Sequence, residues 1–418
     1  MTQDSENEAL ERLNLGLNLN KTGKADEANQ TWRIAIEEGK ASGTDKGREI
    51  AAGAASNLGL NLEKAGEIDE ANQTWRIAIE EGKSSGTDKG REIAAGAAFN
   101  LGLTLENAGN DDEANRAWRI AIEEGKASGT DTGKEIVAGA AFNLGFSLGK
   151  AANDDEANRA WRIAIEEGKA SGTAIGKEIA SKAAFNLGAT LNINWKANEA
   201  NRAWRIAIEE GKASGTDAGK EIAAKAAFNL GTTLNNEGKA NEANQAWRIA
   251  IEEGKASKTA TGKEIAAKAA LNLGLTLEKA GNDDEAKQVW HIAIDEGKAS
   301  GTDMGKEISA NAVFNLGFNL EVAGKVDEAN REYRTAIEEG KASGTDMGRE
   351  LAAGAAINLG FNLEKAGKAD EANQAWRIAI EEGNASGTDT GKEISANAVS
   401  NLGLNLEKAR KADEDNHA

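Results

Sequence analysis

The sequence repeats itself every 43 residues. An aromatic residue recurs at this interval nine times, and the tripeptide Asn-Leu-Gly recurs ten times in the same register. The aromatic positions are Trp32, Trp75, Trp118, Trp161, Trp204, Trp247, Trp290, Tyr333 and Trp376. A fixed period of roughly 20–50 residues is typical of arrays in which each unit is one supersecondary element. The chain of 418 residues is therefore expected to grow in one dimension rather than around one compact core.

Each unit carries the pattern of two helices. Thr87 or Asp88 can cap a first helix, and Gly109 supplies the left-handed residue that ends it. Asn110 begins a second helix with acidic residues in its first turn, and Gly129 closes it. The two apolar stripes are Ile93, Ala97, Leu101 and Leu105, then Ala114, Ala117, Trp118, Ala121 and Ile122. Their spacing predicts an amphipathic helix hairpin.

A single hairpin of this kind would leave most of its apolar stripe in water. Stacking covers it, and one tryptophan that buries roughly 200 Å² contributes up to about 5 kcal/mol. The glycine of Asn-Leu-Gly is costly inside a helix, which indicates a close approach of the partner helix. We therefore predict an all-α solenoid of antiparallel helix hairpins. We expect it to form one domain over residues 1–418, with nine full repeats and a terminal first-type helix at about 388–410.

The unit, Ala98-x-x-Leu101-Gly102-x-x-Leu105 followed by Ala114-x-x-x-Trp118, resembles the tetratricopeptide repeat. It differs from that family in lacking the terminal proline and in being longer than the usual repeat of about 34 residues. The added length is similar to that of the elongated units of kinesin light chains. The resemblance covers nearly the whole chain, and it implies a right-handed superhelix with a concave groove.

Composition excludes several classes of function. The chain has 50 Lys and Arg against 69 Asp and Glu, a net charge of -19, so it repels polyanions, and we expect no nucleic-acid partner. Cysteine is absent, which excludes disulfides and thiolate chemistry. The acidic start lacks the features of a secretory signal, and no long apolar run is present. We therefore expect a cytoplasmic protein that does not bind membranes.

No motif in the chain indicates catalysis. The only histidines, His291 and His417, cannot form a pair of metal ligands or bases. The segment at 129–135, Gly-Thr-Asp-Thr-Gly-Lys-Glu, lacks the spacing of a phosphate loop and recurs as a helix-helix turn. The acidic residues at 111–113 lie in the first turn of a helix, where they offset the helix dipole. We predict a protein that is not an enzyme and that has no cofactor and no metal.

The recurring asparagine is the most informative candidate for binding. It precedes the core leucine by one residue, which places it about 100° around the helix, towards the wall of the groove. In tetratricopeptide proteins, residues at matching places grip an extended peptide backbone, and an amide can donate and accept at once. The alternative is that each asparagine bridges to the neighbouring first helix and fixes the repeat geometry. The candidate residues are Asn57, Asn100, Asn143, Asn186, Asn229, Asn272, Asn315 and Asn358, within a series that runs from Asn14 to Asn401.

Three successive units carry a lysine one turn before this asparagine, namely Lys182, Lys225 and Lys268. On an acidic protein they predict a local positive strip suited to a carboxylate or a phosphate. The resemblance implies the C-terminal carboxylate of a peptide as one such ligand. The alternative is a solvated strip of lysines that pair with glutamates.

Aromatic residues accompany the asparagines. Phe99 and its equivalents directly precede them, and we expect these rings to pack between repeats rather than to contact a ligand. Trp195 replaces the turn glycine in Leu191-Asn-Ile-Asn-Trp-Lys, where a positive φ is needed. It is expected to reshape that turn and to offer an exposed anchor.

Two functions follow from these features. The first is a scaffold that binds an extended protein segment, acidic or C-terminal, through the asparagines and the lysines. The second is a structural protein that assembles end to end through its terminal repeats, because Val399, Leu402 and Leu406 keep the internal pattern in the last helix. A fragment of a larger signalling enzyme is a third reading, suggested by the tenth unit, which breaks off at residues 413–418.

Overall fold

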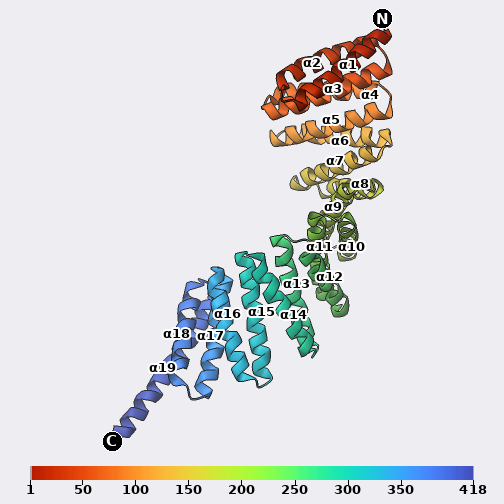
Figure 1. Ribbon diagram of the computed structural model, residues 1–418. Helices are drawn as coiled ribbons and strands as arrows, with labels where there is room; N and C mark the ends of the chain where they lie inside the picture. The colour runs from red at the N-terminus through yellow and green to blue at the C-terminus, as the bar shows by residue number, and fades with distance from the viewer. Residues whose placement is uncertain (1, 418) are drawn as a thin grey trace. The chain divides into compact units, whose positions relative to one another are not determined.

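The computed structural model describes the backbone of residues 2–417 and the side chains of residues 4–411. Within that range the chain forms nineteen α-helices and no strand. Consecutive helices pack pairwise into hairpins, and hairpin follows hairpin along the chain (Figure 1). The predicted all-α array of helix hairpins is thus confirmed, whereas the right-handed sense of the superhelix stays a prediction.

The helices are of two alternating kinds. First-type helices are α1 (Thr2–Lys21), α3 (Asp45–Ala65), α5 (Asp88–Asn107), α7 (Asp131–Lys150), α9 (Ala174–Ile193), α11 (Asp217–Asn236), α13 (Ala260–Lys279), α15 (Asp303–Val322), α17 (Asp346–Lys365) and α19 (Asp389–His417). Second-type helices are α2 (Ala25–Ser42), α4 (Ile68–Ser84), α6 (Asp111–Ser128), α8 (Asp154–Ala170), α10 (Ala197–Ser214), α12 (Ala240–Ala256), α14 (Asp283–Ser300), α16 (Val326–Ser343) and α18 (Ala369–Ala385).

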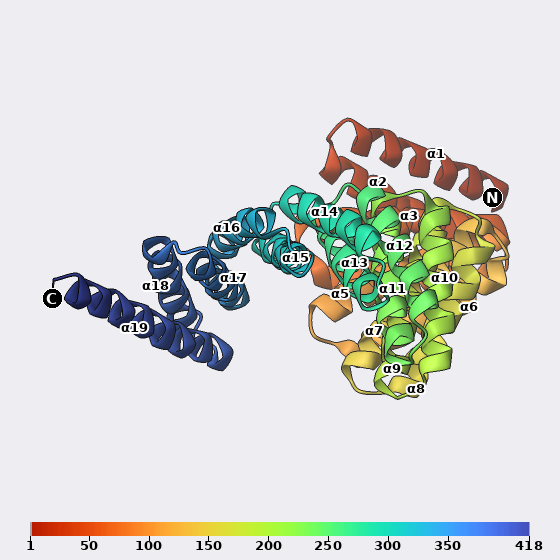
Figure 2. The ribbon, with the colours of Figure 1, turned by 90° about the horizontal axis from the view of Figure 1, so that it is seen from below.

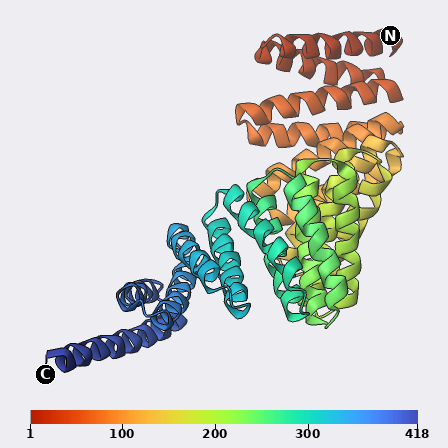
Figure 3. The same cartoon turned by 60° about the horizontal axis from the view of Figure 1, so that its bottom comes forward.

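The chain divides into two compact units, Met1–Gly219 and Lys220–Ala418, each described here by itself. In the first unit, α1, α3, α5, α7 and α9 pack one against the next, and the second-type helices lie beside them (Figure 3). In the second unit the same holds for α13, α15, α17 and α19, and Figure 2 shows α19 running past α18 to its free end. Helix α11 begins in the first unit and continues in the second. A single solenoid over residues 1–418 stays a prediction.

Helix ends follow the predicted signals. Of the two candidate caps, Thr87 rather than Asp88 is the N-cap of α5, and its hydroxyl oxygen accepts a hydrogen bond from the Gly90 N–H at 2.9 Å. Gly109 and Gly129 have φ of 77° and 64°, so both take the left-handed conformation that ends a helix.

Each second-helix aromatic ring packs on the glycine of Asn-Leu-Gly. A methyl group added to Gly102 would overlap the indole ring of Trp118, and the same holds for the equivalent glycine in the other tryptophan-bearing repeats. Trp118 is completely buried. The predicted close approach of the two helices of a hairpin is thus confirmed. It arises because the aromatic ring of the second helix lies directly on the glycine backbone of the first. This contact fixes the distance between the helices of one hairpin.

A recurring hydrogen-bonded cluster ties each first-type helix to the next. The hydroxyl of Thr130, the N-cap of α7, donates to Glu92 of α5 at 2.7 Å, while Ser128 donates to the Gly125 carbonyl at 2.7 Å. We call the threonine-glutamate bond the latch. The latches are Glu6–Thr44, Glu49–Thr87, Glu92–Thr130, Glu135–Thr173, Glu178–Thr216, Glu221–Thr259, Glu264–Thr302, Glu307–Thr345 and Glu350–Thr388. One carboxylate thus holds the cap of the following repeat.

Two glycines of α5 should respond to alanine in opposite ways. Gly102→Ala forces a methyl group into Trp118 and is expected to destabilise the protein by about 1–3 kcal/mol. Gly96→Ala is expected to stabilise it by about 0.5–1 kcal/mol, because the added methyl group meets only Ile136 at 3.8 Å and alanine is the better helix former. Urea unfolding, with hydrogen exchange of the α5 and α6 amides, measures both. Equal effects would contradict the proposed role of the ring contact.

Candidate functional site

The partly exposed residues of each first-type helix lie on one face. In α5 these include Gly96, Phe99, Asn100 and Leu103, which recur at intervals of three or four residues, while the alanines between them are completely buried. We call this surface, with its equivalents on the other first-type helices, the amide stripe. All eight candidate asparagines lie on it and are half-buried. The structure therefore gives them the common position that their spacing predicts.

The asparagine side chains differ in their partners. Asn57 donates to the Gly53 carbonyl of its own helix at 2.9 Å, Asn315 donates to Asn311 at 3.0 Å, and Asn358 donates to the Tyr333 hydroxyl at 3.4 Å. Across the described part of the chain, the side chains of the other five make no hydrogen bond: Asn100, Asn143, Asn186, Asn229 and Asn272. None of the eight bonds to a neighbouring first-type helix among the described residues, so the bridging alternative has no support in these contacts.

The three lysines are paired within their own helices. Lys182 lies 2.7 Å from Glu178, Lys225 lies 2.7 Å from Glu221 and Lys268 lies 3.0 Å from Glu264. The sequence analysis gave such lysine-glutamate pairs as the alternative to a ligand site. The three glutamates offset much of the positive charge of the lysines. Each lysine side chain remains about one-third exposed, at 37%, 34% and 36%. Lys182 belongs to the first unit, and the other two belong to the second.

The glutamates of these pairs also form the latches, a role that the sequence interpretation missed. Burial raises the pKa of Glu178, but hydrogen bonds from Lys182 and Thr216 outweigh it, and the pKa lies below the ordinary value. The same balance lowers the pKa of Glu221, through Lys225 and Thr259, and of Glu92, through Lys89 and Thr130. The sequence does carry a signal for the latches, because a glutamate and a threonine recur 38 residues apart throughout the chain.

Two of the aromatic residues that precede the asparagines, Phe99 and Phe314, pack within the array, as the sequence interpretation expects. A methyl group added to Gly139 of α7 would lie 3.1 Å from the ring of Phe99, which therefore packs against the next first-type helix. The rings of Phe314 and Tyr333 lie 6.0 Å apart. By contrast, Phe146 and Phe318 stand one turn further along and are nearly half exposed. These two side chains form small apolar patches on the amide stripe.

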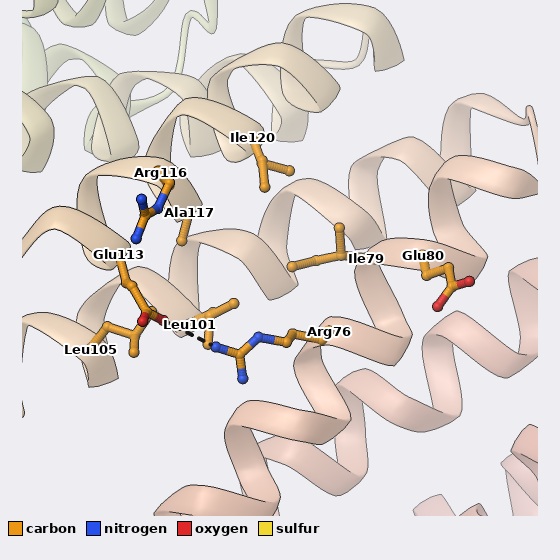
Figure 4. A pocket seen from close by; sticks show the side chains of 9 residues that line it. All are labelled: Arg76, Ile79, Glu80, Leu101, Leu105, Glu113, Arg116, Ala117 and Ile120. Carbon is orange, nitrogen blue, oxygen red and sulfur yellow. Dashed lines mark hydrogen bonds and ion pairs between the residues drawn. The ribbon is translucent and has the colours of Figure 1, made fainter. Parts of the chain in front are cut away.

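Crevices on the opposite side of the hairpins were not anticipated. Between α4 and α6 a crevice of about 340 Å³ is floored by Leu101 and Leu105 of α5, and the ion pair of Arg76 with Glu113 crosses it at 3.3 Å (Figure 4). Equivalent crevices of about 370 and 720 Å³ lie between α6 and α8 and between α16 and α18. They arise because consecutive second-type helices diverge over the leucines of the first-type helix between them. Each can hold an aliphatic side chain.

One further cavity, of about 450 Å³, opens beside the amide stripe in the first unit. Phe146, Trp161 and Ile193 form its apolar wall, and Asn186 and Thr190 supply polar groups. The candidate asparagine Asn186 thus lies at a cavity.

Groups that could support other functions were also searched. Among the described residues no cluster of three His, Asp or Glu side chains could hold a metal ion. His291 is exposed on α14, and the side chain of His417 lies outside the described residues, as do those of residues 413–418, where the tenth unit breaks off. In the described part of the chain, no helix combines the length and the apolar character needed to cross a bilayer.

The hairpin array and its Ala-x-x-Leu-Gly and Trp pattern define a tetratricopeptide-like α-solenoid. Neither a protein-family profile nor a curated protein matches the sequence. Among solved structures, the apo form of RapI is 15% identical, covers 90% of this chain and 97% of its own, and has a TM-score of 0.44.

Two further solved structures are similar to a comparable degree. The C-terminal part of a TPR repeat-containing protein from Cytophaga hutchinsonii is 13% identical over 68% of this chain and 94% of its own, with a TM-score of 0.41. The apo quorum sensor NprR from B. thuringiensis is 14% identical over 91% and 99%, with a TM-score of 0.35. All three scores lie below 0.5, and none of these likenesses bears on the function of this chain.

The latch carboxylates should titrate at low pH. We predict midpoints below about 4.3, the ordinary glutamate value, for Glu92, Glu178 and Glu221. Because the pKa is lower in the folded than in the unfolded state, these groups contribute stability above pH ~4.3 and lose it as the pH falls through the folded value. Carboxyl carbon NMR measures the midpoints, with Glu178→Gln assigning one signal and the urea-unfolded chain as reference. A folded midpoint equal to the unfolded one would contradict the latch.

Proposed function

We propose that this protein is a non-enzymatic scaffold that binds an extended segment of another protein along the amide stripe within one of its two units. One observation carries the proposal: five half-buried asparagine amides occupy equivalent places on successive first-type helices and have no partner among the described residues. A half-buried amide without a partner loses hydration and gains nothing in return. A peptide backbone offers both a donor and an acceptor to such a group.

The lysines add a preference for negative charge to this proposal. Lys182 in the first unit, and Lys225 and Lys268 in the second, each use part of their donor capacity on a glutamate. An ammonium group has three donors, so a carboxylate of the bound segment can share it. We therefore propose an acidic or C-terminal segment as the ligand. The net contribution of each lysine is modest, because the pairs are partly solvated.

A second candidate function, end-to-end assembly, rests on apolar residues at the two ends of the array. Leu15 of α1 is 49% exposed, and Val399 and Leu406 of α19 are 53% and 46% exposed. The residues at the same places in internal repeats are buried: Leu58, Ala356 and Leu363. A second copy could cover these faces by the contacts that internal repeats make.

Binding through the amide stripe predicts separable effects on affinity and stability. A random dodecapeptide display library is selected on the full chain, and the best peptide is measured by calorimetry. Asn100→Ala with Asn143→Ala, or Asn229→Ala with Asn272→Ala, should weaken binding about tenfold, since two hydrogen bonds of about 0.5–1.5 kcal/mol each are lost. The unfolding midpoint should stay unchanged, because these side-chain amides have no hydrogen-bond partner among the described residues.

Matched controls separate binding from folding. Asn61→Ala removes a buried amide that donates to Asn29 at 3.1 Å, so it should lower the unfolding midpoint and leave the affinity unchanged. Lys182→Ala should weaken acidic peptides more than neutral ones, whereas Lys89→Ala breaks a similar lysine-glutamate pair outside the stripe. Unchanged affinity in both asparagine double variants would overturn the proposal.

Sedimentation velocity over a wide concentration range distinguishes the two functions. The scaffold predicts one species of about 43.7 kDa at every concentration. Growth into long rods that Val399→Glu with Leu406→Glu abolishes would instead establish assembly through α19.

A further inference from the structure

The glycine of Asn-Leu-Gly in α19 is uncovered. On the nine preceding first-type helices, a methyl group added to this glycine would meet the aromatic ring of the next second-type helix, as at Gly360 with Trp376. On Gly403 it meets nothing within 4 Å among the described residues. Val399 and Leu406 lie one turn to either side of this glycine and are 53% and 46% exposed. Helix α19 thus exposes the surface on which every other repeat packs a ring.

A cation beside this surface lacks the partner that its equivalents have. Arg334 of α16 pairs with Glu371 in the first turn of α18 at 3.4 Å, and the same pair links other consecutive second-type helices, as between α4 and α6. The equivalent residue of α18 is Arg377, which is exposed and has no ion pair among the described residues. Its side chain stands where the acidic first turn of a further second-type helix would meet it.

A carboxylate at the other end of this surface is also without its usual partner. Glu350 of α17 accepts the latch hydrogen bond from Thr388, the cap that follows α18, at 2.7 Å. The equivalent residue of α19 is Glu393, which is exposed and makes no hydrogen bond or ion pair within the described range. The surface therefore offers one free cation and one free carboxylate, at opposite ends.

Helix α19 is nonetheless held in the array as the earlier first-type helices are. Asn405 is buried and donates to Asn373 of α18 at 2.8 Å. Arg410 stands where Gly367, with a φ of 74°, turns the chain back in the preceding repeat. With arginine at this place the helix continues to His417, and its backbone runs on instead of folding back over the surface (Figure 2). The exposed surface is therefore preformed, which lowers the cost of binding.

The internal repeats show what covers such a surface. A second-type helix places its aromatic ring on the glycine, its acidic first turn beside the arginine, and the threonine that follows it on the glutamate. These three contacts fix the direction of an occupant, with its first turn near Arg377 and its last turn near Glu393. A second copy has no such helix free, because α1 contains no aromatic residue and the second-helix rings are buried in their own hairpins.

We propose that α18 and α19 form a docking site for an amphipathic helix of a partner protein. The helix has an acidic first turn, an aromatic residue that packs on Gly403, and a Ser or Thr after its last turn. It binds as a further second-type helix would, antiparallel to α19. This site lies outside the amide stripe and needs no second copy, so it goes beyond both functions considered above.

The test uses the full chain and a synthetic peptide that copies residues 111–130, from the first turn of α6 to the cap that follows it, with 5-fluorotryptophan in place of Trp118. Fluorine NMR observes the peptide alone. We expect its signal to shift with a Kd below about 0.2 mM, a limit that allows for the cost of ordering a short helix. The peptide with Trp118→Ala, measured by calorimetry, should bind at least about tenfold more weakly. No shift at about 0.5 mM protein would overturn the proposal.

Two glycine variants separate docking from folding. Gly403→Ala should not lower the unfolding midpoint, because the methyl group meets nothing in the described chain and alanine favours the helix. It should weaken the peptide at least about tenfold, since the methyl group takes the place of the ring. Gly354→Ala makes the same change where the methyl group meets only the Phe314 ring at 3.7 Å, and it should leave the affinity unchanged. Equal affinity of Gly403→Ala and the parent chain would sink the docking site.

A double-mutant cycle tests the direction of the helix. Arg377→Gln in the protein and Glu113→Gln in the peptide should each weaken binding about twofold, and together no more than either alone. Arg334→Gln breaks the equivalent pair one repeat earlier and should leave binding unchanged. Losses that add in the cycle would show that Arg377 and Glu113 do not meet, and the proposed direction would be wrong.

A second copy is the alternative occupant of this surface. If the chain alone forms oligomers in sedimentation velocity and Gly403→Ala abolishes them, α19 is an interface between copies and the partner helix is wrong. A monomer that binds the peptide one to one supports the docking site, whatever the asparagine variants do to peptides on the amide stripe.

Discussion

The contact between each second-helix aromatic ring and the glycine of Asn-Leu-Gly sets the geometry on which the rest of the structure depends. The ring needs bare backbone beneath it, so the first helix accepts a glycine in its interior at a cost of about 1 kcal/mol relative to alanine. The indole N–H has a further cost. Trp32 donates to the Leu13 carbonyl at 3.3 Å. Seven other indole nitrogens are buried without a partner among the described residues: those of Trp75, Trp118, Trp161, Trp204, Trp247, Trp290 and Trp376.

Tyr333 occupies the position of the second-helix tryptophan in its repeat, and its polar group has hydrogen-bond partners. Its hydroxyl donates to Glu321 at 2.7 Å and accepts from Asn358 at 3.4 Å. Burial, together with the Glu321 carboxylate, raises the pKa of the Tyr333 hydroxyl far above its ordinary value. Seven repeats keep a tryptophan whose N–H has no partner among the described residues, so the larger apolar area of the indole outweighs the lost hydrogen bond there.

The latch explains why amides rather than charges are left for binding. In α9, Glu178 accepts hydrogen bonds from both Thr216 and Lys182, so the charged groups of this face are occupied in holding the next repeat. Asn186 lies two turns further along the same helix and has no such task. A ligand that used the glutamates would have to compete with the cap of the following helix. A ligand that uses Asn186 competes with no hydrogen bond of this side chain among the described residues.

Much of this arrangement could be predicted from the sequence, because period, capping residues and apolar spacing are local signals. The period located the hairpins, and Phe99 was correctly expected to pack between repeats. The pairing of Lys182 with Glu178 was left open, since a spacing of four residues within one helix permits the ion pair but equally leaves the lysine able to face a ligand. The crevices over Leu101 and Leu105 were missed, because the divergence of second-type helices has no signature in a repeating pattern.

A near-identical array has a limited capacity for selectivity. Equivalent asparagines present the same donor and acceptor in every repeat, which suits the peptide backbone, the one part of a ligand that also repeats. Discrimination between ligands must come from places where the repeat is broken. Gly149, Ala189, Ile193 and Trp195 are such breaks, and three of them line one cavity while Trp195 lies two residues after Ile193. In the proposed function, the uniform residues supply affinity for an extended chain, and selectivity is left to the positions where the repeat is broken.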